Sequence, residues 1–425
     1  MLASVIDYLG DPILVLNVQK FFGVRYCAKE TLSYDRNDDP KQFPGKLSPK
    51  KNDSGLKQIR KVNDNSSKIS PPNSNLSSEN DFSTDSDIDE TTCVVTNKFW
   101  FYLFLICTSL GDEIFYATFI PFWFWNIDGA VGRRVVLVWT IVMYIGQGFK
   151  DIIKMPRPGP PVQKLQTKWA LEYGMPSTHA MVAVSIPFSV LLYTMDRYQY
   201  SFSWGLSFAL IWCSLICLSR VYLGMHSVLD IVAGILLTIL LLIPLIPMVD
   251  ALDIILLTRW WSPGLVFVVS IACIIYYPNS EKWTPTRGDT TMIVSVCAGI
   301  QIGAWINYQL GHMEPSNLSP PYKIIWPSYD MLGMAILRTI LGFCGVIATR
   351  AIAKSISYAF VCALLGKDKN ELRNSPNSLQ NKDKIIVELC YKYFTCSMIG
   401  LTTLVLFPNV FKLVGIERPT FHTEI

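Results

Sequence analysis

The chain has 425 residues, of which 51% are hydrophobic and 16% are charged, and its formal net charge is +4. This composition is too apolar for an ordinary soluble globular protein and indicates an integral membrane protein. The small net charge and the lack of a dense Lys and Arg block exclude nucleic acid as a natural partner. The 11 cysteines are scattered without metal-ligand spacing, so they predict neither a disulfide framework nor a metal centre.

The N-terminal part divides into two segments of different character. Residues 1–33 form an amphipathic segment, in which 1–24 are expected to lie on the membrane surface as a helix or to form a buried hairpin. Residues 34–95 are rich in Ser, Asn, Asp, Lys and Pro, with too little apolar surface to offset the entropy of ordering. We therefore expect a disordered polar linker there.

From residue 98 onward the sequence contains repeated apolar stretches long enough to cross a hydrocarbon core of roughly 30 Å. We expect an all-α, polytopic bundle of about 8–10 transmembrane helices. Residues 96–250 would form the catalytic membrane core, and residues 251–425 further transmembrane helices and a tail. The predicted spans are 98–126, 132–150, 179–195, 203–219, 227–248, 262–278, 291–310, 333–353 and 393–415.

Two features of this pattern matter for the site. The first stretch carries Gly111, Asp112 and Glu113, which is consistent with a tilted helix, a broken helix or two short segments. The third to fifth spans are joined by short connectors and should be antiparallel neighbours. The loop 150–178 and the connector 219–226 then lie on one membrane face, where their charged residues can meet.

The first charged segment, KDIIKMPRP, places Lys150 and Arg157 at this face. An Arg fork and a compact Lys charge together suit the oxygens of a phosphoryl group. The same residues beside a transmembrane span are also typical of side chains that only snorkel to the surface or set the orientation of the helix.

The second segment, GMPSTHAM, precedes a long apolar helix. Ser177 can act as its N-cap, and the free amide groups of a helix N-terminus, including that of Thr178, bind anions. His179 would then lie in the first turn, beside a phosphate cradle. Taken alone, the segment also fits a capped helix with a surface histidine.

The third segment, SRVYLGMHSVLD, brings Arg220, His226 and Asp230 into one turn and helix start. His226 and Asp230 are four residues apart, so on a helix the carboxylate can accept a proton from one imidazole nitrogen and leave the other unprotonated. The same pair is found in metal sites, although few further His or Cys ligands are present.

The three segments, in this order, resemble the signature motifs of the type-2 phosphatidate phosphatase superfamily, which includes the vanadium-dependent haloperoxidases. The stretches KDIIKMPRPGPPV, EYGMPSTHAM, CLSRVYLGMHSVLDIVAG and WTPTRGDTT resemble more narrowly the sphingosine-1-phosphate phosphatases. The resemblance runs from about residue 98 nearly to the end. Thr178 stands where the superfamily usually has Gly, and the sphingosine-phosphate branch is similar to this chain in having a hydroxyl residue there.

The resemblance implies a lipid phosphate phosphatase that needs neither metal nor cofactor. Lys150, Arg157, Ser177, Thr178 and Arg220 would hold the phosphate. His226 would attack phosphorus, Asp230 would orient the His226 ring, and His179 would protonate the leaving alkoxide.

The substrate implied by the resemblance is a sphingoid base phosphate such as sphingosine 1-phosphate, and the implied location is the endoplasmic reticulum membrane. The sequence does not indicate protein partners. We also expect Arg287, in the RGD tripeptide, to line the entrance for the lipid head group.

Three other functions compete with hydrolysis. A lipid phosphotransferase of the same fold would pass the group to a lipid alcohol, but the related transferases lack a segment like Lys150 to Pro158. A catalytically silent scaffold or transporter would not need the intact Lys, Arg, His and Asp positions. A soluble haloperoxidase is a poor match for a chain with many spans.

Overall fold

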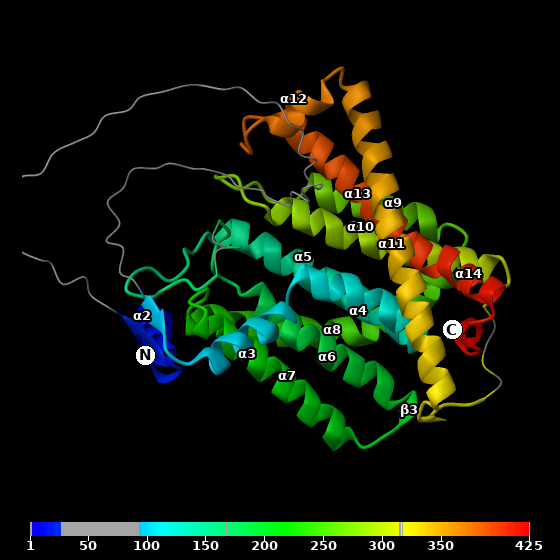
Figure 1. Ribbon diagram of the computed structural model, residues 1–425, viewed down its shortest axis with the longest axis horizontal. Helices are drawn as coiled ribbons and strands as arrows, with labels where there is room; N and C mark the ends of the chain where they lie inside the picture. Colours follow the sequence, from blue (N-terminus) through cyan, green and yellow to red (C-terminus); the bar gives the residue numbers. More distant parts are fainter. Residues whose placement is uncertain are drawn as a thin grey trace, which may run out of the picture. The chain divides into compact units, whose positions relative to one another are not determined.

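The computed structural model describes residues 2–26, 93–166, 168–169, 171–313, 316 and 318–424 (Figure 1). Nearly all regular structure in these residues is helical, as expected from the sequence. The four strands have only two or three residues each: β1 (Val24–Tyr26), β2 (Cys93–Val95), β3 (Tyr198–Gln199) and β4 (Tyr322–Lys323). The helices are α1 (Leu2–Gly10), α2 (Pro12–Phe21), α3 (Lys98–Ser109), α4 (Glu113–Asn126), α5 (Gly129–Ile153), α6 (Thr178–Met195), α7 (Phe202–Tyr222), α8 (Val228–Thr258), α9 (Ser262–Ile275), α10 (Thr286–Gln309), α11 (Tyr329–Leu364), α12 (Lys369–Asn374), α13 (Lys382–Leu404) and α14 (Leu406–Val414), with a short 3-10 turn, η1 (Phe421–Thr423).

Among the described residues, seven helical segments are long and apolar enough to cross a membrane, one of them being α13 continued by α14. The count is eight if the bent pair α3 and α4 forms one span. The all-α, multi-span architecture predicted from the sequence is therefore confirmed, at the lower end of the expected number. The predicted span 262–278 corresponds to α9, which has only 14 residues and is shorter than a full crossing.

The N-terminal segment forms two helices separated at Asp11. The Asp11 side chain accepts a hydrogen bond from the amide of Ile13 and so caps α2. Gln19 of α2 is buried and donates to the carbonyls of Gln163 (2.7 Å) and Tyr222 (3.0 Å). Helix α2 thus packs on the end of α7. The predicted polar linker, residues 34–95, lies outside the described residues except for its last three.

The first predicted span is interrupted, which excludes the single tilted helix among the alternatives that its sequence left open. Together α3 and α4 are long and apolar enough to cross a membrane, but the two helices are bent by 57° at the break between them. Gly111 and Asp112 lie at this break, and Asp112 is the N-cap residue of α4. The acid that interrupts the apolar run therefore marks the point where the helix ends and restarts.

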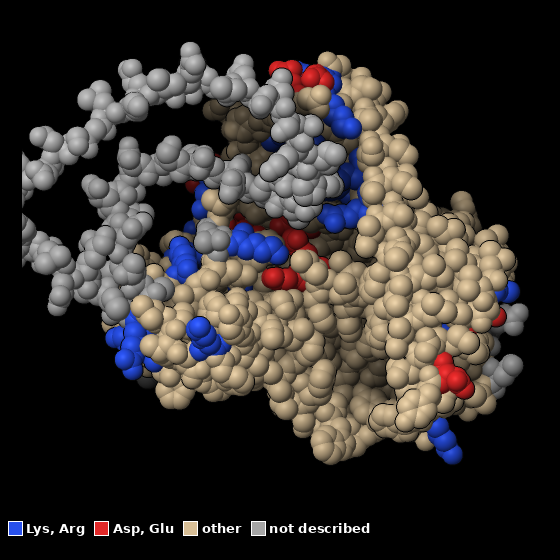
Figure 2. Space-filling view, viewed as in Figure 1, with Lys and Arg blue, Asp and Glu red and all other residues tan. Residues whose placement is uncertain are grey.

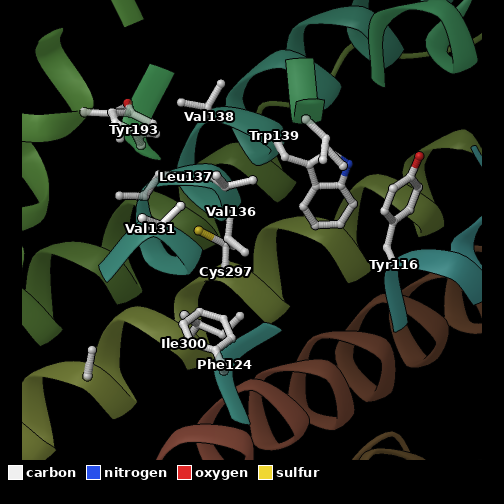
Figure 3. Packing of buried hydrophobic residues seen from close by; sticks show 14 of the residues in the cluster. Tyr116, Phe124, Val131, Val136, Leu137, Val138, Trp139, Tyr193, Cys297 and Ile300 are labelled. Carbon is white, nitrogen blue, oxygen red and sulfur yellow. The ribbon is translucent and has the colours of Figure 1, made fainter. Parts of the chain in front are cut away.

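The centre of the bundle is formed by α5, α6 and α10. In the most apolar 18-residue stretch of each helix, 67% of α5, 72% of α6 and 67% of α10 is buried inside the protein. The same stretch is only 17% buried in α7 and 11% buried in α11. Helices α7 and α11 therefore turn most of their apolar surface toward lipid. Figure 3 shows the packing from close by, where Val136 of α5 lies beside Cys297 of α10, and Tyr116 of α4 beside Trp139.

The helix order brings the predicted site segments to one end of the bundle. Helices α5 and α7 end there, and α6 and α8 begin there. The connection 276–285 reaches the same end, because the Tyr277 hydroxyl donates to Asp151 (2.9 Å) and Lys154 forms an ion pair with Glu281. The first turns of α13 are there too, since Ile385 and Glu388 line one cavity with Asp151.

Candidate active site

The loop after α5 and the turn before α8 meet through Arg157. Its Nη1 atom donates to the carbonyl of Met225 (2.7 Å) and lies 3.3 Å from Nε2 of His226. The two segments are 69 residues apart in the chain. The expectation that loop 150–178 and connector 219–226 meet is therefore confirmed, and they do so at one end of the bundle.

Glu172 holds the two cations of the first motif in place. Lys150, at the end of α5, donates to its carboxylate (2.7 Å), and Nη2 of Arg157 lies 3.8 Å from the same oxygen. All three side chains are buried. Burial alone would raise the pKa of the Glu172 carboxyl, but the charges of Lys150 and Arg157 hold it below its ordinary value. The group is therefore an anion, and it compensates part of the positive charge of the site.

The second motif begins α6 as predicted. Ser177 is the N-cap residue, its hydroxyl accepts from the amide of Ala180 (3.4 Å), and Thr178 is the first residue of the helix. The amide of Ser177 donates to the carbonyl of Asp230 (3.0 Å), which ties the start of α6 to the first turn of α8. The helix N-terminus therefore lies beside the turn that carries His226, where its amides can face an anion.

His179 lies in the first turn of α6 and is buried. Its Nε2 atom is 3.0 Å from the carboxylate of Asp112, which lies at the break between α3 and α4. The adjacent Gly111 leaves space for the ring, because a Cβ atom there would approach Cδ2 of His179 to 2.6 Å. The break in the first span therefore supplies both a partner and room for His179.

Arg220, near the end of α7, is fully buried. Its Nη1 atom donates to the hydroxyl of Thr108 (2.7 Å) and to the side chain of Gln166 (3.0 Å). Its Nε and Nη2 atoms have no hydrogen-bond partner among the described residues. A buried guanidinium with two unused donor atoms is suited to donate hydrogen bonds to phosphate oxygens.

His226 lies in the turn between α7 and α8. Its Nδ1 atom is 3.6 Å from Asp230, which is longer than a hydrogen bond of about 2.7–3.2 Å. The same Asp230 oxygen accepts from the amide of Ser227 (2.8 Å), as part of the capping box of α8. The two side chains face each other as predicted, but the predicted hydrogen bond is not formed: Nδ1 of His226 has no hydrogen-bond partner among the described residues.

The His226 ring is neutral at pH 7. Burial lowers its pKa well below the ordinary value of 6.5, and the positive charges of Arg157 and Arg220 act in the same direction. A neutral imidazole keeps the lone pair that nucleophilic attack requires. With Nδ1 turned toward Asp230, the nitrogen beside Arg157 is Nε2.

Sequence reasoning missed Glu172 and Asp112 as members of the site. The signal for Asp112 was its charge inside an apolar stretch, which is a common mark of function in membrane proteins.

Arg287 lines a cavity that also contains Asp151, next to Lys150 in the chain, and it donates to the carbonyl of Ile274 (3.2 Å). Its predicted role at the entrance stays open.

A multi-span helical bundle that gathers two buried histidines and three buried cations at one end defines a membrane protein with a cationic polar site inside its helices. The sequence profile of the PAP2 superfamily matches residues 132–253, a range that contains all eight predicted site residues. No solved structure matches this chain.

Curated relatives narrow the class further. The chain is 41% identical to sphingosine-1-phosphate phosphatase 1 of Rattus norvegicus over 325 residues, which cover 76% of this chain and 74% of that protein. It is 40% identical to sphingosine-1-phosphate phosphatase 2 of Mus musculus over 330 residues, 76% of this chain and 90% of that protein. A lipid phosphate phosphatase delta of Arabidopsis thaliana is 28% identical over 335 residues, 71% and 80% of the two chains. The chain belongs to the sphingosine-1-phosphate phosphatase family, within the PAP2 superfamily.

Proposed function

We propose that this protein hydrolyses sphingosine 1-phosphate and related sphingoid base phosphates to the free base and inorganic phosphate. The observation that carries the proposal is the position of His226 Nε2, 3.3 Å from Nη1 of Arg157 in a neutral, buried ring. A phosphate oxygen bound to Arg157 would bring phosphorus within reach of this nitrogen. The names of the relatives supply the substrate class.

In the first step, Nε2 of His226 attacks phosphorus and the bond from phosphorus to the ester oxygen breaks. His179, held by Asp112, donates a proton to the leaving alkoxide, which departs as the alcohol of the sphingoid base. Lys150, Arg157, Arg220, Ser177 and the amide of Thr178 stabilise the charge on the transferring group. Asp230 stabilises the imidazolium that forms.

In the second step, His179 accepts a proton from water, and the water oxygen attacks the phosphohistidine. The bond from phosphorus to nitrogen breaks, and phosphate leaves with one oxygen derived from water. A phosphotransferase would use the same first step but pass the group to a lipid alcohol. The origin of this oxygen therefore separates the two reactions.

The test uses the purified full-length protein in detergent with 32P-labelled sphingosine 1-phosphate. We expect His226→Ala to lower phosphate release by about 10³-fold or more, as for other essential nucleophiles. An acid-labile, alkali-stable phosphoprotein should form in the wild type and be absent from the variant. His312→Ala, at a histidine outside the site, is the matched control. Full activity of His226→Ala would refute the mechanism.

In water enriched in 18O, hydrolysis should place one labelled oxygen in the released phosphate. Transfer of 32P to an added lipid alcohol in preference to water would favour the phosphotransferase. Released phosphate without label would mean that the bond from carbon to oxygen breaks, and it would refute attack on phosphorus. The family resemblance also leads us to propose residence in the endoplasmic reticulum with the site on the lumenal side. Glycosylation tags inserted in the loop between α5 and α6 should then be modified, and unmodified tags would contradict the lumenal placement.

A further inference from the structure

A cluster of charged side chains lies where the first turn of α10 meets α13, and the three phosphatase motifs do not include it. Lys392 of α13 forms an ion pair with Glu388 at 2.8 Å and lies 3.8 Å from Asp289 of α10. Gly288 makes room for this contact, because a Cβ atom there would collide with Nζ of Lys392. The charge of Glu113, at the start of α4, also acts on Asp289. We call Asp289, Glu113, Glu388 and Lys392 the Asp289 cluster.

Asp289 is the member of this cluster whose carboxylate is buried without a hydrogen bond. The residue is only 7% exposed, and its side chain has no hydrogen-bond partner among the described residues. Lys392 lies beyond hydrogen-bond distance of it and is bonded to Glu388 instead. A buried carboxylate in this condition is costly unless a cation reaches it. The position therefore favours a ligand with a positive charge.

The charge balance around Asp289 leads to the same conclusion. The described groups whose charges act on it include three carboxylates, those of Glu113, Glu172 and Glu388, and one cation, Lys392. Repulsion among the carboxylates makes a further cation favourable. Figure 2 shows Asp and Glu side chains inside the hollow at the centre of this face of the molecule.

Asp289 is linked to the proposed phosphate site through α5. Thr290, the next residue of α10, donates a hydrogen bond to Gln147, which lies one helical turn before Lys150. Glu172, which accepts a hydrogen bond from Lys150, is close enough for its charge to act on Asp289. The Asp289 carboxylate and the proposed phosphate ligands therefore belong to one polar region at this end of the bundle.

The leaving-group side of the site lies toward the same cluster. Asp112 holds His179, the proposed acid for the leaving oxygen, and Glu113 follows Asp112 directly in the chain. In a sphingoid base phosphate, an ammonium group stands on the carbon next to the one that bears the ester oxygen. An ammonium group bound by Asp289 would thus leave the ester oxygen near His179 and the phosphate near Lys150.

We propose that Asp289 binds the ammonium group of the sphingoid base and so selects this class of lipid phosphate. The assignment rests on the hydrolysis proposed above and adds its selectivity. Lys392, held by Glu388, would fix the position of the Asp289 side chain. A lipid phosphate whose nitrogen is acylated, or that has no nitrogen, would leave the Asp289 carboxylate buried without its cation.

The test compares two lipids that differ at this nitrogen, sphingosine 1-phosphate and N-acetylsphingosine 1-phosphate, with the full-length protein in neutral detergent. Asp289→Asn should lower kcat/KM for sphingosine 1-phosphate by about 10–100-fold, mainly through KM, because the buried ammonium loses its anion. The value for the N-acetyl lipid should stay close to that of the wild type, which also shows that the variant is folded. If the N-acetyl lipid is not turned over, its Ki against sphingosine 1-phosphate replaces kcat/KM in the comparison.

Two variants control this experiment. Glu281→Gln removes an exposed carboxylate at the same end of the bundle and should keep the wild-type preference between the two lipids. Asp289→Glu restores the charge and should recover part of the preference that Asp289→Asn loses. Equal losses for both lipids in Asp289→Asn would overturn the proposal and make Asp289 a structural residue.

A measurement on the wild type alone tests the same point without any variant. Sphingosine should inhibit phosphate release at a lower concentration than N-acetylsphingosine, because only sphingosine carries the ammonium group. Equal Ki values would overturn the ammonium assignment and leave the hydrolysis intact. Failure of the wild type to release phosphate from sphingosine 1-phosphate would instead refute the proposed function, and this assignment with it.

Discussion

Asp112 is the residue that connects the broken first span to the chemistry. It orients His179 at 3.0 Å, so Asp112→Asn should leave the ring without its anionic partner. We expect kcat to fall by about 10²–10⁴-fold, as when the carboxylate of other Asp–His pairs is replaced, while KM changes little because Asp112 does not hold the phosphate. Steady-state phosphate release over a range of substrate concentrations separates the two parameters.

The neighbouring acid provides the control for this prediction. Glu113 begins α4 but has no hydrogen bond to His179 among the described contacts, so Glu113→Gln should keep kcat close to the wild-type value. Equal losses in the two variants would mean that Asp112 acts through the general charge of this region, and not by positioning His179.

Glu172 neutralises buried charge, and its loss should affect folding as well as binding. In Glu172→Gln, Lys150 and Arg157 would remain buried without their anion, which costs about 3–5 kcal/mol in comparable buried pairs. Thermal unfolding in detergent would measure this loss. Glu281→Gln removes the partner of Lys154 at an exposed site and should cost at most about 1 kcal/mol. A similar unfolding temperature for both variants would contradict this account.

At the residue scale, the sequence was informative wherever function depends on local spacing. The N-cap at Ser177, the first-turn position of His179 and the facing of His226 toward Asp230 all follow from a few consecutive residues. Asp112 and Glu172 could not be found this way, because their partners lie 67 and 22 residues away and the pairings depend on how helices and loops pack.

Helices α10 and α13 cross closely, and the crossing depends on glycine. A Cβ atom at Gly299 would lie 2.1 Å from the backbone carbonyl oxygen of Ser397, so Gly299→Ala must push the two helices apart. We expect a lower unfolding temperature in detergent. Gly333→Ala in α11 meets no atom within 4 Å and should be neutral or stabilising, since Ala favours helices by about 1 kcal/mol over Gly. Equal stability of the two variants would refute the close-crossing argument.

At the scale of elements, hydropathy identified the long helices but not how they end. The bend between α3 and α4 depends on Gly111 and Asp112 packing beside His179, which a hydropathy window does not register. The predicted span 393–415 corresponds to the later part of α13 and to α14, and α13 begins earlier, at Lys382, because its polar first turns are capped by Asn381. Polar helices such as α12 have no apolar signal at all.

The end of the bundle opposite the active site is closed by the C-terminal residues. The Glu424 carboxylate accepts from the amide of Gly129 at the start of α5 (2.6 Å) and from Arg418 (2.7 Å). Its backbone carbonyl accepts from Arg133 (3.1 Å). Glu424→Gln should therefore lower the unfolding temperature while KM in the remaining folded protein stays unchanged. Asp383→Asn, which breaks an exposed ion pair with Lys367, should leave the unfolding temperature close to that of the wild type.

For the whole molecule, the order of three motifs and the parity of the spans between them were enough to predict that the motifs meet at one face. The docking of α2 against α7 was not predictable. It depends on buried side chains of α2: Gln19 contacts two carbonyls far along the chain, and Val15 packs in one cluster with Val221. The sequence around them reads only as an amphipathic helix.

This docking has a practical consequence for anyone cloning the protein. Gln19 holds the carbonyl of Tyr222, and the chain from there turns within four residues to His226. A shortened protein that starts at α3 would keep every phosphatase motif. It would lose the Gln19 hydrogen bond that supports the turn carrying His226. Fragments trimmed for crystallisation should therefore retain the first 26 residues.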